Sequence, residues 1–351
     1  MIRVGIAGAS GLAGGELLRL VSQHPDLELT FVGGSSNVGR RPAELHPGLR
    51  LPFGGLTIQP VTDEVADRCD VVLLATPAPV SASLAGLLAD KVAAVVDLSG
   101  AFRIHDPELH ARWYPRVARD TVLTDRFVYG VPELVADRMA DALLISLPGC
   151  FATAITLGLA PLVDAGLRLD TVVVDGKTGS SGGGLQLRTA DLHPLRDGAI
   201  APYAPAGHRH AAEVRDFFAQ RKSEAIGRLA MSAYGVSHVR GLLASSYVFT
   251  DQEISPQELH RTYVRYYKDQ PFVRVRRHTE TLIPVPDPQA VLGSNYCDVT
   301  PLLDDDGSRI VVLAALDNLV KGAAGQAIQA VNLRFGLPQT TGLTMQPVMP
   351  A

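Results

Sequence analysis

The sequence has few cysteines, no export signal and no basic cluster, and these absences narrow the kinds of protein it can be. Its three cysteines, Cys69, Cys150 and Cys297, are an odd number without the close spacing of a zinc site or a disulfide framework. The N-terminal residues lack the charged start, apolar stretch and cleavage site of a signal peptide. We therefore expect a protein of the reducing cytoplasm.

Charge and hydrophobicity exclude two further classes. The net charge is −4, and no stretch combines Lys and Arg with aromatic side chains, so nucleic acid is not an expected partner. The uncharged segment 142–163 is long enough to cross a bilayer. However, Leu147-Pro148-Gly149-Cys150 interrupts it, which favours a buried strand, a turn and a helix over a membrane span.

The hydrophobic pattern changes along the chain. Up to residue 150, short β-branched stretches alternate with amphipathic ones, which is typical of βαβ units and a parallel sheet. We expect strands at 2–7, 28–32, 71–76 and 92–98, and helices at 16–22 and 80–89. Beyond residue 150, long loops at 176–184, 192–207 and 283–295 separate strand-like segments such as 171–175 and 244–250. The sequence therefore predicts an α/β protein whose second domain is α+β, with a helical tail after Asn318.

A glycine-rich loop follows the first expected strand and opens a helix. Its residues are Gly8-Ala9-Ser10-Gly11-Leu12-Ala13-Gly14. Glycines there let the backbone turn tightly and approach a pyrophosphate, which the first N–H groups of the helix would bind. This position favours a dinucleotide site, and a tight turn without a ligand is the alternative.

The segment after the second expected strand indicates which dinucleotide would bind. It carries no acidic residue for the ribose hydroxyls of NAD. It reads Gly33-Gly34-Ser35-Ser36-Asn37-Val38-Gly39-Arg40-Arg41, and its hydroxyls, N–H groups and guanidiniums suit a 2′-phosphate. NADP is therefore the expected cofactor, with a merely solvated arginine pair as the alternative.

Cys150 is the candidate nucleophile. It follows the turn at Pro148-Gly149 and begins an uncharged helix-like stretch. The partial positive charge at a helix N-terminus favours a thiolate. The alternative is a small buried hydrophobic residue, which is how we interpret Cys69 and Cys297 beside their strand-like neighbours.

His208 and His210 form the one tight histidine pair, and Glu213 follows three residues after it. An imidazole is the usual general base near neutral pH, and a carboxylate can orient it. Zinc binding through His-x-His would need a further ligand that no spacing nominates, so no metal is expected. Two surface histidines remain the other alternative.

The segment Gly179-Ser180-Ser181-Gly182-Gly183 matches the GxSxG elbow of serine hydrolases, which makes Ser181 the nucleophile of an alternative function. An elbow needs a helix directly after the serine, whereas the following glycines favour a flexible loop. Such a loop could instead donate hydrogen bonds to an oxyanion or phosphate.

Together these motifs resemble the N-acetyl-γ-glutamyl-phosphate reductase family, including its relatives that act on aminoadipyl phosphate attached to an amino-group carrier protein. The likeness spans nearly the whole chain. It also rests on Asp97-Leu98-Ser99, Phe102-Arg103, Tyr129-Gly130-Val131-Pro132-Glu133-Leu134, Val239-Arg240-Gly241 and Asp317-Asn318-Leu319-Val320-Lys321-Gly322-Ala323-Ala324-Gly325-Gln326-Ala327. The resemblance implies a Rossmann NADP-binding domain over 1–149, completed by the C-terminal helix within 318–351. It implies an α+β catalytic and oligomerisation domain of the semialdehyde dehydrogenase type over 150–317.

The resemblance also implies an activity, which is NADPH-dependent reduction of a small acyl phosphate to a semialdehyde through a cysteine thioester in a homo-oligomer. Cys150 would be the nucleophile and His208 the acid/base, supported by Glu213. The NADP contacts would be Gly8, Ser10, Gly11, Leu12, Ala13, Gly14, Gly34, Ser35, Ser36, Arg40 and Asn318. The substrate contacts would be Arg103, Arg240 and His210.

Two departures bear on the substrate. Phe151 stands where the glutamyl enzymes usually have Tyr, and Ala211-Ala212-Glu213 lacks their Pro before Glu. Both look more like the lysine-biosynthesis branch, which would add an acidic carrier protein as partner. One methylene of acyl chain is a small difference for a pocket, so N-acetylglutamyl phosphate of arginine biosynthesis stays open. A non-catalytic NADP-binding sensor is the third alternative.

Overall fold

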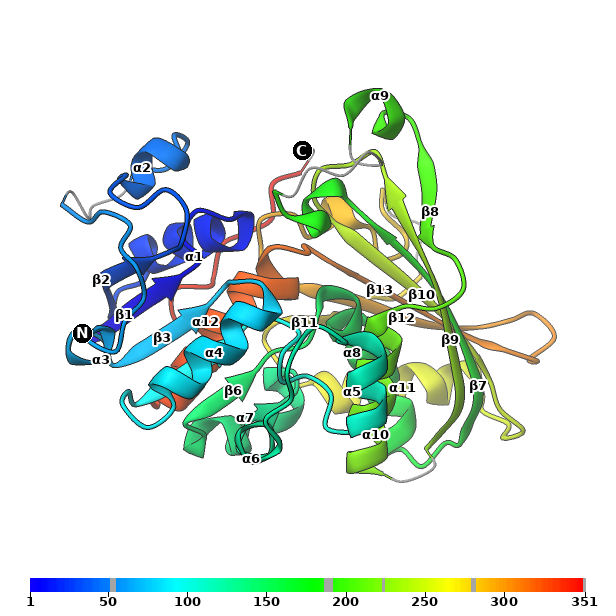
Figure 1. Ribbon diagram of the computed structural model, residues 1–351. Helices are drawn as coiled ribbons and strands as arrows, with labels where there is room; N and C mark the ends of the chain where they lie inside the picture. The colour runs from blue at the N-terminus through cyan, green and yellow to red at the C-terminus, as the bar shows by residue number, and fades with distance from the viewer. Residues whose placement is uncertain (51–54, 186–191, 223–224, 279–281, 350–351) are drawn as a thin grey trace. The chain divides into compact units, whose positions relative to one another are not determined.

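The computed structural model describes residues 1–50, 55–185, 192–222, 225–278 and 282–349, which form two compact units (Figure 1). The first unit contains Met1–Gly149 and Ala323–Thr344, and the second contains Cys150–Gly322 and Met345–Ala351. The structure thus differs from the sequence-based boundary, which assigned all of 318–351 to the first domain. Asn318 belongs to the second unit because its side-chain Oδ1 accepts a hydrogen bond from the backbone N–H of Gly241.

Six parallel strands form the sheet of the first unit, in the order β2-β1-β3-β4-β6-β5. The strands are β1 (Ile2–Ala7), β2 (Leu27–Gly33), β3 (Val71–Leu74), β4 (Ala94–Asp97), β5 (Val128–Tyr129) and β6 (Leu144–Ser146). Because β2 and β3 lie on opposite sides of β1, the strand order reverses there. Open α/β sheets bind ligands at the carboxyl ends of the strands at such a switch point.

The helices of the first unit follow the expected alternation with the strands. They are α1 (Leu12–Gln23), α2 (Pro42–Leu45), α3 (Val65–Arg68), α4 (Ala78–Leu88), α5 (Pro107–Trp113), α6 (Thr121–Asp125), α7 (Pro132–Asp141) and α12 (Gly325–Arg334). The strands and helices expected from the sequence are confirmed, with ends that differ by a few residues. β3, β4 and β6 are buried along their whole length, which is typical of parallel strands covered on both faces.

A seven-stranded mixed sheet forms the second unit, in the order β11-β12-β13-β10-β7-β9-β8. The strands are β7 (Leu169–Thr178), β8 (Ile200–Ala204), β9 (Ile226–Val236), β10 (Leu242–Phe249), β11 (Val273–Val275), β12 (Cys297–Leu303) and β13 (Ile310–Leu316). Helices α8 (Cys150–Asp164), α10 (Arg209–Arg221) and α11 (Pro256–Tyr267) pack on it, and α8 contacts both of the others. Shorter helical segments are η1 (Ser180–Gly183), α9 (His193–Arg196), η3 (Pro288–Ala290) and η4 (Val320–Ala324).

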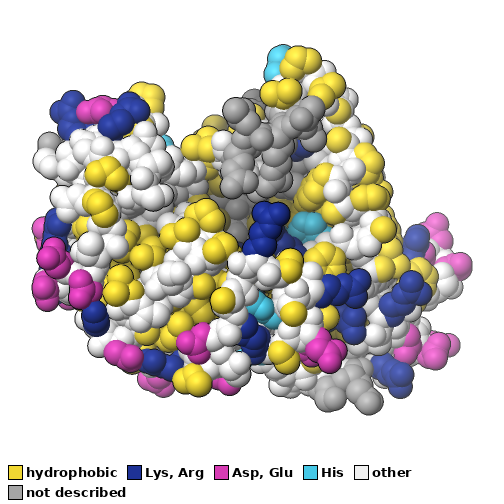
Figure 2. Space-filling view, in the orientation of Figure 1, with side chains coloured by type: hydrophobic (Ala, Val, Ile, Leu, Met, Phe, Trp, Pro, Cys, Tyr) yellow, Lys and Arg dark blue, Asp and Glu magenta, His cyan; other side chains and the backbone are white. Residues whose placement is uncertain are grey.

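The prediction of a loop over 192–207 is wrong, because this segment contains α9 and the edge strand β8. Among the described strands β8 pairs with β9 alone, and both Ile200 and Tyr203 are exposed on it. An edge strand without a buried face shows no alternation of polar and apolar residues, so the usual sequence signal is missing. Exposed hydrophobic side chains gather over α9 and β8 (Figure 2).

Helix α8 is the buried centre of the second unit. Every residue from Phe151 to Val163 is buried, which explains why this stretch carries no charge. Within the ranges that the structure describes, no helix is both long and apolar enough to cross a bilayer.

A proline inside α8 leaves one backbone carbonyl without its helical donor, and a tyrosine of α11 replaces that donor. Pro161 has no N–H, so the carbonyl of Leu157 one turn earlier lacks its usual helical partner. The hydroxyl of Tyr267 donates to that carbonyl, and the hydroxyl of Tyr263 donates to the next one, at Gly158. Both phenols are buried. The helix can therefore tolerate the proline because α11 lies beside it.

We expect the substitution Tyr267→Phe to lower the free energy of unfolding by about 1–3 kcal/mol, because it leaves a buried carbonyl unpaired. Pro161→Ala restores a backbone N–H that can bond Leu157. In the Pro161→Ala background, Tyr267→Phe should therefore lower the free energy of unfolding by a smaller amount. Urea unfolding of the four proteins measures the difference, and an equal cost in both backgrounds would contradict this account of the proline.

Candidate active site

The glycine loop of the first unit leaves space only for backbone. Gly8 has φ +88°, and a Cβ at Gly14 would lie 2.2 Å from the carbonyl oxygen of Gly8. Gly11 precedes α1 as its N-cap, and the first turn of α1 has no acidic residue. The loop is therefore a cradle that side chains would fill, with helical N–H groups at its end, which fits a pyrophosphate.

His46 supports this loop, and the sequence analysis did not identify it. Its Nε2 donates to the carbonyl of Ala9 over 2.8 Å. Its ring also covers Gly15, where a Cβ would lie 2.6 Å from the ring carbon Cε1. A lone histidine carries no motif, so only the fold could reveal that it links the segment after β2 to the glycine loop.

The residues expected to bind the 2′-phosphate lie after β2. Ser35, Ser36 and Arg40 are exposed, and Gly34 is half-buried. The Nε atoms of Arg40 and Arg41 lie 3.5 and 2.8 Å from the carboxylate oxygens of Glu44, and the hydrogen bond from Arg41 lowers the pKa of that carboxyl. The two guanidiniums are thus held near one another at the surface of the first unit.

Cys150 is the first residue of α8, it is half-buried, and it forms no disulfide bond. Gly322 packs directly against it, since a Cβ at position 322 would lie 2.6 Å from Cys150 Cβ. Gly322 belongs to η4, a π-helical turn whose N–H groups reach five residues back, and it donates to the carbonyl of Asp317 over 3.0 Å. Such π-turns occur frequently at functional sites.

His208 caps α10 with its side chain. Its Nδ1 accepts a hydrogen bond from the backbone N–H of His210 over 3.2 Å, so the neutral imidazole carries its proton on Nε2. Nε2 lies 3.4 Å from the hydroxyl oxygen of Tyr203. The ring of Phe151, which follows Cys150 in the chain, lies 5.8 Å from the His208 ring, centroid to centroid. The structure therefore brings the histidine next to the start of α8.

The surroundings of His208 disfavour its charged form. Burial, together with the nearby charge of Arg209, lowers its pKa from 6.5 to about 4, and the charge of Glu213 acts in the opposite direction. The imidazole is consequently neutral at physiological pH.

Glu213 approaches the other histidine. It is fully buried, and its Oε1 lies 3.8 Å from Nε2 of His210, which is longer than a hydrogen bond. The expected support of His208 by Glu213 stays a prediction.

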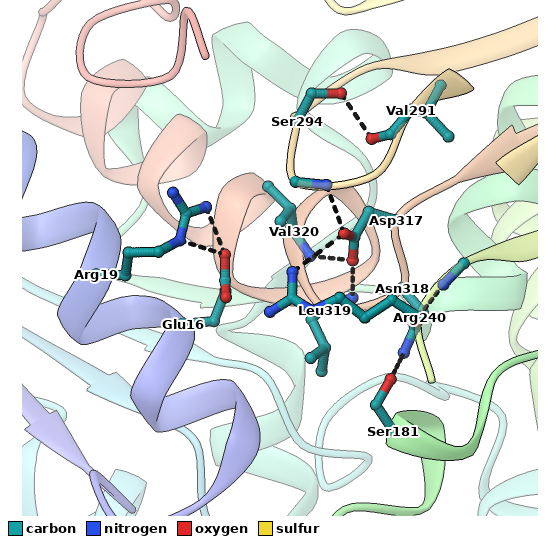
Figure 3. Close-up of polar contacts among 12 residues, drawn as sticks. Glu16, Arg19, Ser181, Arg240, Val291, Ser294, Asp317, Asn318, Leu319 and Val320 are labelled. Atoms are coloured by element: carbon teal, nitrogen blue, oxygen red, sulfur yellow. Dashed lines mark hydrogen bonds and ion pairs between the residues drawn. The ribbon is translucent and has the colours of Figure 1, made fainter. Parts of the chain in front are cut away.

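Asp317 and Asn318 connect several turns of the second unit (Figure 3). Nη1 of Arg240 lies 3.1 Å from Oδ2 of Asp317. Asn318 accepts from the N–H of Gly241 over 2.8 Å and donates from Nδ2 to the hydroxyl oxygen of Ser181 over 2.9 Å. Both polar ends of the Asn318 amide thus have partners inside this unit, so its expected contact with NADP stays a prediction.

Arg103, another of the three expected substrate contacts, lies in the first unit and is 7% exposed. Its Nη2 donates to the carbonyl of Leu98 over 2.6 Å. The neighbouring Asp97 is fully buried, and burial raises the pKa of its carboxyl.

Ser181 does not sit on a nucleophile elbow. It is 7% exposed and lies in η1, a single turn of 3-10 helix that ends at Gly183. Within the described residues that follow, up to 185, no α-helix begins, and the elbow requires one directly after the serine. The hydroxyl oxygen of Ser181 accepts from Asn318, which gives it a structural partner.

Family models match both parts of the chain. Residues 3–142 match the NAD-binding domain of semialdehyde dehydrogenases, and residues 150–318 match the dimerisation domain of the same enzymes. The chain belongs to the N-acetyl-γ-glutamyl-phosphate reductase family of the semialdehyde dehydrogenases. It is an oxidoreductase of the semialdehyde dehydrogenase type, as the sequence predicted.

Named relatives cover the full length of this family member. The LysW-L-2-aminoadipate/LysW-L-glutamate phosphate reductase of Saccharolobus solfataricus is 38% identical over 100% of the chain and 99% of the relative. The N-acetyl-gamma-glutamyl-phosphate reductase of Methanopyrus kandleri is 40% identical over 98% of each.

Solved structures agree on the fold. Aspartate semialdehyde dehydrogenase II of Vibrio cholerae, with 17% identity, superposes with a TM-score of 0.73 over 96% of this chain and 98% of that one. The enzyme of Candida albicans, solved with NADP, gives a TM-score of 0.70 at 17% identity over 95% and 98% of the two chains. The family models and these structures together confirm the α/β fold class, with NAD-binding and dimerisation domains of the semialdehyde dehydrogenase type.

We expect His208 to stay neutral from pH 8 down to about pH 5, since its folded pKa is about 4. Between the ordinary value near 6.5 and this lower value, only the unfolded chain binds the proton, so the imidazole makes the protein less stable as the pH falls. NMR titration of the His208 ring carbon, assigned with a His208→Gln variant, measures this directly. A transition near pH 6.5 in the folded protein would contradict the lowered pKa.

Proposed function

We propose that this protein reduces an acyl phosphate to a semialdehyde with NADPH, through a thioester on Cys150. The observation that carries the proposal is the placement of Cys150 at the start of buried α8, packed against Gly322 and followed by the ring that contacts His208. A sulfur at a helix N-terminus is favoured as thiolate.

The proposed cofactor is NADP, and the residues of the first unit fit it. The Gly8 to Gly14 cradle would hold the pyrophosphate, and Arg40 with Ser35 and Ser36 would hold the 2′-phosphate. NADPH supplies a hydride that reduces the acyl carbon of the thioester.

Cys150 performs the covalent part of the reaction. Its thiolate attacks the acyl carbon, and the bond from that carbon to the phosphate oxygen breaks, so phosphate leaves with the electron pair. With the cofactor bound, the thioester on Cys150 would accept its hydride and become a thiohemiacetal oxyanion. Its collapse breaks the carbon–sulfur bond and regenerates the thiolate with release of the aldehyde.

His208 would stabilise the oxyanion as a neutral hydrogen-bond donor. Its Nδ1 is occupied by the N–H of His210, so Nε2–H is the group available to an oxygen. This arrangement lets the helix N-terminus, rather than the imidazole, favour the thiolate of Cys150. The donated hydrogen bond lowers the cost of negative charge on the substrate oxygen.

The proposed substrate is aminoadipyl phosphate carried by an acidic amino-group carrier protein, in lysine biosynthesis. The names of the archaeal relatives that include LysW support this choice. N-acetylglutamyl phosphate, in arginine biosynthesis, is the second candidate because the Methanopyrus kandleri relative is named for it. We further propose a homo-oligomer, in keeping with the matched dimerisation domain, and a cytoplasmic location, in keeping with three cysteines that form no disulfide bond.

We expect Cys150→Ser to reduce NADPH oxidation with an acyl phosphate by roughly 10³-fold or more, because the oxygen of serine is a far weaker nucleophile at this site. NADPH affinity, measured by fluorescence titration, should be unchanged. Ser181→Ala is the matched control and should keep activity within a few-fold. Loss of activity in Ser181→Ala with full activity in Cys150→Ser would favour the hydrolase alternative, and a wild-type protein that binds NADPH but reduces no acyl phosphate would favour the sensor.

Assays with two aldehydes distinguish the substrate candidates. The rate of phosphate-dependent NADP reduction is measured once with carrier-bound aminoadipate semialdehyde as the substrate and once with N-acetylglutamate semialdehyde. The proposal expects the higher kcat/KM with the carrier-bound aldehyde, and the reverse order would assign the protein to the acetylated substrate.

We expect Arg40→Ala to weaken NADPH binding by about tenfold or more and to leave NADH binding unchanged, since only NADPH has the 2′-phosphate. Arg126→Ala is the control, because Arg126 is also a surface arginine of the first unit paired with a carboxylate, that of Asp90. Titration with both cofactors measures the effect, and equal losses for NADPH and NADH would disprove the assignment.

A further inference from the structure

A buried carboxylate outside the proposed chemistry connects three turns of the second unit. Asp317 is fully buried. Its Oδ1 accepts hydrogen bonds from the backbone N–H groups of Leu319 and Val320, over 2.8 and 3.2 Å. Its Oδ2 accepts from the N–H of Gly293 over 2.8 Å and from Nη1 of Arg240 over 3.1 Å. Backbone from two segments therefore fixes the carboxylate (Figure 3).

Strand register explains why these segments meet. In the sheet, Leu316 of β13 pairs with Leu242 of β10 on one side and with Cys297 of β12 on the other. The residue after Leu316 is Asp317, and Arg240 lies just before β10. Their partnership is thus set by the register of two long antiparallel ladders, which is costly to shift.

Arg240 is the side chain that this carboxylate can orient. Its side chain is 31% exposed, whereas that of Asp317 is 0% exposed. A buried, hydrogen-bonded carboxylate is a rigid partner, and a guanidinium has a planar fork whose direction follows from one fixed edge. The ion pair therefore controls where the Arg240 cation points.

The same segment contacts Cys150. The N–H of Gly322 donates to the carbonyl of Asp317, and Gly322 packs against Cys150. The partner of Arg240 and the neighbour of Cys150 are therefore joined by one hydrogen bond within a single π-turn. The segment 317–322 therefore both pairs with Arg240, through Asp317, and packs against the proposed nucleophile, through Gly322.

We propose that Asp317 is a positioning residue that aims Arg240 at an anionic group of the substrate, either a carboxylate or the phosphate. This inference rests on the proposed function, because it assigns the anion to the acyl-phosphate substrate. Oδ1 of Asp317 accepts hydrogen bonds from the backbone at the start of η4, and Oδ2 accepts them from Arg240 and Gly293. Asp317→Asn keeps one oxygen for the backbone but places an N–H₂ donor where two donors already point, so it should release the guanidinium.

The test is the reverse reaction, in which a semialdehyde and inorganic phosphate each have their own KM. We expect Asp317→Asn to raise one of the two KM values about tenfold or more, with kcat within about threefold and NADPH affinity unchanged. A higher KM for phosphate would identify the phosphate as the anion, and a higher KM for the semialdehyde would identify its carboxylate.

Two further comparisons separate positioning from simple stability. Ser294→Ala is the matched control. It removes the buried hydrogen bond from the Ser294 hydroxyl to the carbonyl of Val291 and leaves the ion pair of Arg240 with Asp317 in place. It should lower the melting temperature without changing either KM. In an Arg240→Ala background, Asp317→Asn should change the affected KM less than about twofold, because its effect passes through Arg240.

Either of two results would overturn the inference. The first is a normal KM for both substrates in a folded Asp317→Asn variant. The second is an equal increase in KM with and without the Arg240 side chain. If Asp317→Asn fails to fold, Arg240→Lys replaces it, since lysine keeps the charge without the fork. A KM raised about fivefold or more then supports orientation, and a normal KM overturns it. A wild-type protein without reductase activity would instead contradict the proposed function.

Discussion

The N-terminus of α8 is the constraint on which the second unit depends. The helix is buried from Phe151 to Val163, so it can present polar groups only at its ends, and its first residue is Cys150. Burial of a proline-containing helix also requires donors for its carbonyls, which the tyrosines of α11 provide. The packing that stabilises the unit is therefore the packing that places a thiol at the positive end of a helix.

Close backbone approach recurs at each of the proposed sites. Gly14 packs the glycine loop against Gly8, and Gly322 brings the π-turn against Cys150. A Cβ at either position would collide with its neighbour. Polar side chains then fix what the glycines bring together: His46 holds the glycine loop, and Asp317 with Asn318 holds the turns around Arg240. Rigid support of this kind is what oriented catalysis requires.

The histidine pair shows where sequence reasoning reached its limit. The sequence grouped His208, His210 and Glu213, and the structure shows that the contacts among them follow helix geometry. His210 and Glu213 are three apart inside α10 and share a face, whereas His208 lies before the helix and caps it. The spacing could have indicated this. The neutral state of His208 could not be predicted, because burial by the whole unit determines it.

The sequence alone determined the local features of the protein. These are the alternation of strands and helices, the glycine loop after β1 and the cysteine at the start of a helix. Each of these depends on residues close together in the chain. The edge strand β8, the role of His46 and the pairing of Asp317 with Arg240 were decided only by tertiary structure. Arg240 and Asp317 lie 77 residues apart, and they meet because β10 and β13 pair in one register. Register is a property of the assembled sheet, since it depends on which strands become neighbours and on how their buried faces match.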